Sequence, residues 1–129
     1  MAAAPILCAL AFCGILALLA AFQLALALGA PWGRLSWGGG HPGVLPVRLR
    51  VGSACSILVY AVFALIALGR SGLVTLLPEA VSRVGMWIVF GVLVLNVLQN
   101  LASRSTAERA VMTPIALLLA ALALVLALG

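Results

Sequence analysis

Amide side chains stand inside long apolar runs of this sequence, where a polar group needs a hydrogen-bond partner. Asn96, Gln99 and Asn100 are spaced i, i+3 and i+4, so they share one face of a helix. Gln23 lies in an earlier apolar run, and Ser53 stands near the start of another. Polar groups in such surroundings are costly unless they are satisfied, so the pattern predicts either a binding site or hydrogen bonds between helices.

Catalytic and metal chemistry find little support in the residue types. His41 is the only histidine, and no cysteine or acid stands near it in the sequence to complete a metal site. The three cysteines form no CxxC pair, and no GxxxxGK phosphate-binding pattern occurs. Gln23, the polar residue of the first apolar run, cannot titrate, and we expect no buried acid. We therefore predict no catalytic residue, no metal and no cofactor, and a protein that is not an enzyme.

Composition predicts that these residues sit in a membrane. Hydrophobic residues make up 67% of the 129 positions, charged residues make up 7%, and the mean hydropathy is +1.38. A soluble domain carries about 25% charged residues. The net charge of +5 comes from seven arginines scattered singly along the chain, which argues against a nucleic-acid surface. Such arginines favour contact with anionic lipid headgroups.

Four apolar runs are long enough to cross a bilayer, at about residues 5–30, 47–68, 82–102 and 107–128. The first has no basic residues before it and exceeds the apolar length of a signal peptide, so we expect it to be retained. Pro46 and Pro78 suit the starts of the second and third helices, and Ser105 to Glu108 form a capping box before the fourth. The prediction is an all-α integral membrane protein, with residues 1–129 forming a single antiparallel four-transmembrane-helix bundle.

Small residues recur at helical spacing in the first and last runs. One ridge comprises Ala9, Cys13, Ala17, Ala21, Ala25 and Gly29, and the other comprises Ala116, Ala120, Ala123 and Ala127. Small side chains let helices approach closely in lipid, so both ridges predict helix contacts.

In an antiparallel bundle, the polar residues named above all fall in the membrane half next to the first and third loops. The first loop is rich in glycine and proline and adds polar and aromatic residues at the same end: Trp32, Arg34, Trp37, His41, Arg48 and Arg50. We interpret this convergence as a hypothetical binding vestibule that comprises Gln23, Ser53, Asn96, Gln99, Asn100 and these loop residues. The alternative is that the amides and hydroxyls only join the helices.

The arginine distribution predicts the orientation. Five of the seven arginines flank the first and third loops, and Arg70 and Arg83 flank the second. The positive-inside rule then places the first and third loops in the cytoplasm and both termini outside.

Two segments resemble a group of uncharacterised small four-span bacterial membrane proteins. The first, residues 29–53, carries GAPWG, WGG and LP.RLR, and the second, residues 100–114, carries NLASRS..ER before a proline. The resemblance implies a multi-pass protein of a bacterial plasma membrane and brings no known activity.

Two functions fit these observations. The first expectation is a non-enzymatic accessory subunit or homo-oligomer of a larger membrane complex. The alternative is a small transporter or lipid-binding protein that uses the polar vestibule on the side of the first and third loops.

Overall fold

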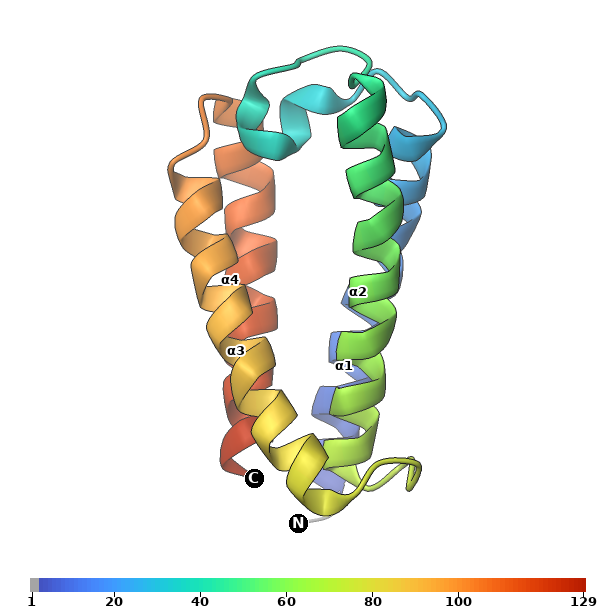
Figure 1. Cartoon of the computed structure of the whole chain (residues 1–129). Helices are drawn as coiled ribbons and strands as arrows, with labels where there is room; N and C mark the ends of the chain where they lie inside the picture. The colour runs from blue at the N-terminus through green and yellow to red at the C-terminus, as the bar shows by residue number, and fades with distance from the viewer. Residues whose placement is uncertain (1–2) are drawn as a thin grey trace.

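The computed structural model describes residues 3–129 and forms four long helices in that range (Figure 1). They are α1 (Ala3–Ala27), α2 (Val47–Ser71), α3 (Glu79–Leu101) and α4 (Thr106–Leu128). Two short 3-10 helices, η1 (Gly33–Leu35) and η2 (Trp37–Gly39), lie in the loop between α1 and α2. Each long helix is apolar enough to cross a membrane, so the predicted all-α, four-span architecture is confirmed.

Local sequence signals explain where the helices begin. Pro46 and Pro78 directly precede α2 and α3, where a residue without an N–H loses no helical hydrogen bond. Ser105 caps α4, because its hydroxyl oxygen accepts a hydrogen bond from the Glu108 amide at 3.3 Å. Gly72 ends α2 with a left-handed φ of 87°, a conformation that glycine adopts without a side-chain clash.

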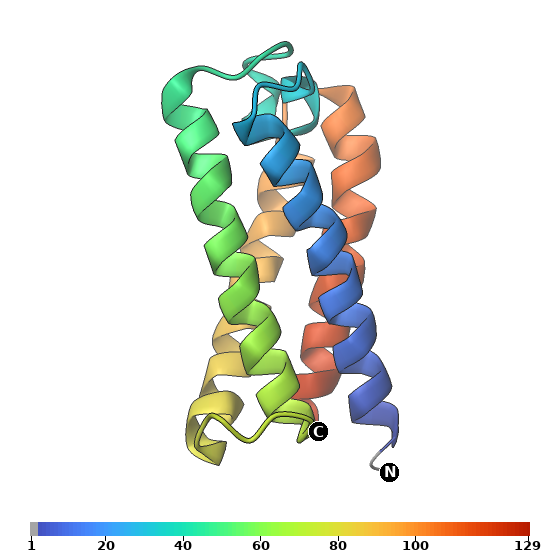
Figure 2. The ribbon, with the colours of Figure 1, turned by 90° about the vertical axis from the view of Figure 1, so that its right-hand side faces the viewer.

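The bundle consists of two antiparallel hairpins. The most extensive packing joins α1 to α2 and α3 to α4, while α2 meets α3 and α1 meets α4 over smaller areas. Both termini and loop two (residues 72–78) lie at one end (Figures 1 and 2). Loop one (residues 28–46) and loop three (residues 102–105) lie at the other end.

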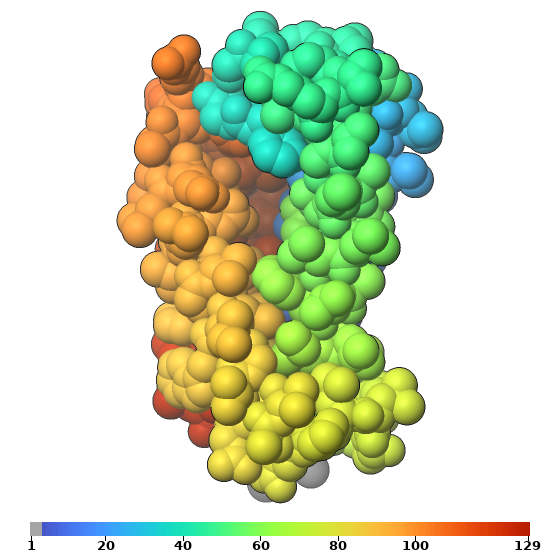
Figure 3. All heavy atoms as spheres, viewed as in Figure 1, coloured from blue at the N-terminus to red at the C-terminus, as the bar shows by residue number. Residues whose placement is uncertain are grey.

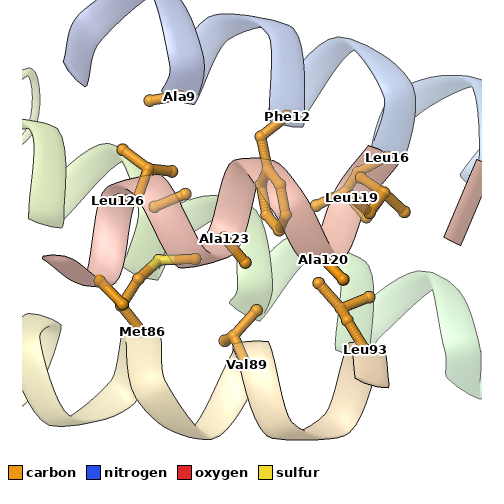
Figure 4. Packing of buried hydrophobic residues seen from close by; sticks show 12 residues of the cluster. Ala9, Phe12, Leu16, Met86, Val89, Leu93, Leu119, Ala120, Ala123 and Leu126 are labelled. Carbon is orange, nitrogen blue, oxygen red and sulfur yellow. The ribbon is translucent and has the colours of Figure 1, made fainter. Parts of the chain in front are cut away.

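Hydrophobic side chains fill the half of the bundle nearest the termini. The buried core draws on the first half of α1, the end of α2, the first half of α3 and the second half of α4. Figure 4 shows Phe12 of α1 and Met86 and Val89 of α3 directed toward α4, where Leu119 and Leu126 lie. This apolar cluster ends near Leu16 and Leu93, and the other half of the bundle combines polar residues with apolar ones.

The two small-residue ridges differ in how far they are buried. Ala116, Ala120, Ala123 and Ala127 are all buried, as the spacing on α4 predicts. Of the ridge on α1, Ala9 is buried and Cys13 contacts α2 through its thiol, which donates to the Ala64 carbonyl at 3.8 Å, whereas Ala17 and Ala21 are exposed, so only part of this ridge makes buried helix contacts. A strict four-residue repeat advances by about 40° per step around a helix of 3.6 residues per turn, and it therefore winds off the contact face.

Loop one folds across its end of the bundle and is attached to loop three. The Gly33 amide donates to the Gly43 carbonyl at 3.0 Å, so the loop closes on itself. The Arg104 amide donates to the Gly38 carbonyl at 3.0 Å. Gly39 lies so close to loop three that a Cβ there would stand 2.5 Å from that of Ser105. Loop one therefore covers this end of the bundle and packs against loop three.

Candidate ligand-binding cavity

A cavity of about 480 Å³ lies beneath loop one, in the half of the bundle that the apolar core leaves unfilled. Side chains from all the long helices and from loop one line it. Its polar and aromatic lining comprises Phe22, Gln23, Ser36, Trp37, Ser56, Tyr60, Asn96, Gln99, Asn100 and Glu108. Figure 3 shows a hollow on this face between α2 and α3, just below loop one. A volume of this size suits a small ligand.

Gln23 connects the two helices of the first hairpin at the cavity wall. Its Nε2 donates to the Tyr60 hydroxyl at 3.3 Å, which joins α1 to α2. Its Oε1 is buried and has no hydrogen-bond partner among residues 3–129. Gln23 therefore joins the two helices, and its enclosed Oε1 is left without a partner beside the cavity.

The amide face predicted on α3 is turned toward the cavity to different degrees. Asn100 is buried, and its Nδ2 donates to the Met112 carbonyl of α4 at 3.5 Å. Asn96 is half-buried on the cavity wall, and Gln99 lines the cavity while remaining exposed. The bond from Asn100 joins α3 to α4, as the interpretation of helix-joining amides predicts.

Glu108 overturns the expectation that no acid is buried. Its side chain is only 4% exposed and lines the cavity. The capping box forms only in part, because the Ser105 amide donates to the Ser103 hydroxyl at 3.1 Å instead of to Glu108. The Glu108 carboxylate is thus free of the role that the sequence pattern predicted for it, and its Oε1 has no partner within the described chain.

The residue spacing on α4 indicates that Glu108 lies on the same side of the helix as the buried alanines. Stepping back from Ala120 by fours reaches Ala116, Met112 and Glu108, and these last three all line the cavity. The ridge predicted on α4 begins at Ala116, whereas the same spacing continues back to the first turn of the helix. There the capping pattern offered a different explanation for the same residue.

Trp37 closes the cavity from above in a strained backbone conformation. Its φ is +53°, which bulky residues rarely adopt. The indole N–H donates to Ser53, which is fully buried, at 3.0 Å. Gly52 allows this contact, because a Cβ there would stand 2.8 Å from the indole ring. Backbone strain of this kind persists only where surrounding contacts enforce it, and it is commonest at functional positions.

The other loop residues of the predicted vestibule lie outside the cavity lining. Trp32 stacks on Phe22, with ring centroids 6.3 Å apart, and Phe22 in turn lines the cavity. Arg50 donates through Nε to the Ala27 carbonyl at 3.0 Å, at the end of α1. Arg34 and Arg48 are exposed.

His41 has a buried Nδ1 without a partner among the described residues, and it too is outside the lining. In the described chain, residues 3–129, no three His, Cys, Asp or Glu side chains lie together as a metal site would require.

The cavity has a one-sided electrostatic character. Of the described residues that line it, one is an acid, Glu108, and none is an arginine or lysine. The buried atoms without partners on its wall are the Oε1 atoms of Gln23 and Glu108, both of them acceptors. These two oxygens need hydrogen-bond donors, whereas the amide groups of Asn96 and Gln99 on the same wall can donate as well as accept.

No protein-family model, curated protein or solved structure matches this chain. The resemblance to small four-span proteins is supported at the level of architecture, in the four long apolar helices of residues 3–129.

Proposed function

We propose that this multi-pass membrane protein binds a small amphiphilic molecule in the cavity beneath loop one, as a small transporter or lipid-binding protein. The observation that carries the proposal is the cavity of about 480 Å³ with a mixed polar and apolar wall. Side chains that served only to join helices would interdigitate, since packing is what holds helices together in lipid. A role as accessory subunit or homo-oligomer has no comparable geometric support.

A binding or carrier role is favoured over an enzymatic one by the lining itself. Glu108 stands there without a histidine, cysteine or second acid beside it among the described residues. Nucleophilic catalysis commonly pairs a nucleophile with a histidine or another base beside it, and the described lining offers no such histidine or cysteine. The position of the hollow between α2 and α3 would give a ligand access from the lipid (Figure 3).

Filling the cavity should abolish ligand retention. Ala116 is buried on the cavity wall, so Ala116→Phe places a ring in the space that a ligand would occupy. We expect native mass spectrometry of the gently purified protein to show a bound small molecule or lipid in the wild type and at least a tenfold lower occupancy in the variant.

The matched control is Ala121→Phe, which adds the same ring on the exposed side of α4. It should leave occupancy unchanged. Equal retention in both variants would mean that the bound molecules coat the outer surface, and the proposal would fall.

We further propose that the protein lies in a bacterial plasma membrane with loop one in the cytoplasm and both termini outside. The arginine imbalance supports the orientation, and Arg34, Arg48 and Arg104 are exposed at the loop one end, where they can meet anionic headgroups. The resemblance to bacterial four-span proteins supports the location.

Cysteine labelling should report this orientation. On a background without native cysteines, Thr75→Cys in loop two should react with an impermeant maleimide from outside intact cells. Gly40→Cys in loop one, where a side chain meets open space, should react only after permeabilisation. The reverse pattern would show that the topology is inverted.

A further inference from the structure

We infer that the ligand of this cavity carries an ammonium group and that Glu108 is its counter-ion. The inference rests on the proposed function, because it names the chemical class of the molecule that the cavity holds. It follows from three features of the wall: a buried acid, an absence of bases in the described lining, and an apolar, aromatic remainder.

The first feature is the burial of Glu108 without a partner. Glu108 is more than nine-tenths buried, and its Oε1 has no hydrogen-bond partner within residues 3–129. Burying a carboxylate is costly unless a cation or several donors meet it. The other acid, Glu79, shows the contrast, since it is exposed and paired with Arg83 at 3.3 Å.

The second feature decides the sign of the ligand. An anion would meet Glu108 with no arginine or lysine in the described lining to offset the repulsion. A neutral hydroxyl could donate one hydrogen bond, but it would leave the charge uncompensated. An ammonium group brings both a positive charge and hydrogen-bond donors for the Glu108 carboxylate.

The third feature decides the body of the ligand. Apolar side chains such as Leu19, Ile115 and Leu119 share the lining with the rings of Phe22, Trp37 and Tyr60. Aromatic faces attract cations and also pack against apolar groups. A bare metal cation would occupy only a small part of about 480 Å³ and would leave these surfaces without contacts. The fit is to an amphiphilic amine, either a free molecule or the headgroup of an aminolipid.

The first experiment compares headgroups on one body. 2-Phenylethylammonium, 2-phenylethanol and phenylacetate are titrated calorimetrically into the full-length protein in non-ionic detergent, with Ala116→Phe as the blocked reference for partition into micelles. We expect the ammonium to bind at least about tenfold more tightly than the alcohol, as a charge-assisted hydrogen bond in a buried site predicts. Phenylacetate should bind least.

The second experiment removes the charge and keeps the shape. Glu108→Gln should lower the affinity for 2-phenylethylammonium about tenfold or more and leave that for 2-phenylethanol unchanged. Glu79→Gln is the matched control, because it removes the exposed acid at the other end of the bundle and should change neither affinity. If Glu108→Gln does not fold, the order of the three headgroups on the wild type decides the question by itself.

An experiment with lipids distinguishes a free amine from the headgroup of an aminolipid. Native mass spectrometry from mixed micelles of phosphatidylethanolamine and phosphatidylglycerol with matched acyl chains should show Glu108-dependent retention of the former if the ligand is an aminolipid. Tight binding of free 2-phenylethylammonium without that retention would indicate a soluble amine.

The outcomes distinguish the two proposals. If no compound and no lipid is retained by the wild type above the Ala116→Phe reference, the proposed function fails. If the cavity binds all three headgroups alike, or prefers phenylacetate, the binding function stands and the ammonium inference is overturned. Calorimetric binding of sodium chloride as tight as that of 2-phenylethylammonium chloride would also overturn the ammonium inference, in favour of a metal-cation site.

Discussion

Gly33→Ala should unfold the cap of the bundle and produce the largest loss of stability of any single methyl group added to loop one. A Cβ at this position would stand 1.9 Å from the His41 carbonyl oxygen and 2.7 Å from that of Gly43. Both obstacles are backbone atoms, so the returning segment of the loop must move and the hydrogen bond from Gly33 to Gly43 is lost. We expect the free energy of unfolding in detergent to fall by about 3 kcal/mol.

Gly40→Ala provides the control for this experiment. Gly40 lies in the same loop with a right-handed helical φ of −72°, and an added Cβ meets nothing within 4 Å. Its effect should stay within about 0.5 kcal/mol, the range of ordinary surface substitutions. Limited proteolysis should likewise cut loop one faster only in Gly33→Ala. Equal stability of the two variants would show that loop one is not packed as described.

Arg70→Gln should weaken the opposite end of the bundle. Arg70 donates through Nε to the Leu126 carbonyl at 3.0 Å and through Nη2 to that of Ala127 at 3.3 Å. These bonds join the last turn of α2 to the last turn of α4, where a positive charge also faces the negative end of the helix dipole. Two charge-assisted bonds at a half-buried site predict a loss of about 2 kcal/mol in the free energy of unfolding.

Arg83→Gln is the matched substitution. Arg83 pairs with Glu79 four residues earlier on α3, and both side chains are more than half exposed. Exposed pairs of this type contribute about 0.5 kcal/mol or less. Thermal unfolding of the two variants side by side should therefore separate them clearly. A loss as small for Arg70→Gln as for Arg83→Gln would mean that the Arg70 bonds do not form in the membrane-protein fold.

The number of arginines near each loop does not reveal what each arginine contacts. Arg70 and Arg50 each bond to carbonyls at the end of a neighbouring helix. Arg34 of loop one and Arg48 in the first turn of α2 are exposed, although they lie at the same end of the bundle as Arg50. The topology rule treats all of these arginines alike because it depends on charge and not on contacts.

The architecture could be predicted from the sequence because it depends on local properties. Apolar runs long enough to span a bilayer, prolines at helix starts and a serine cap at Ser105 are each decided within a few residues. In lipid, moreover, the backbone must satisfy its hydrogen bonds within each span, which leaves the helix as the form for such a run. The predicted helix bounds consequently lie within a few residues of those observed.

The gathering of polar residues at one end was also predictable, since antiparallel helices bring Gln23 and Asn96 to the same level. What the sequence could not decide is which side chains fill the interior and which leave it open. The apolar core and the cavity use residues of the same helices, and their division depends on how the two hairpins pack against each other. This packing joins segments that are distant in the sequence.

Glu108 shows the limit most clearly. The sequence placed it in a capping box at a helix start, and that local pattern predicts a carboxylate bonded to the backbone. In the folded chain, the Ser103 hydroxyl takes the amide of Ser105, and the carboxylate lies in the cavity instead. A local sequence pattern predicts which hydrogen bonds a side chain can make. The tertiary structure decides which of them forms, because it places competing partners beside the side chain and determines whether water or a ligand has access to it.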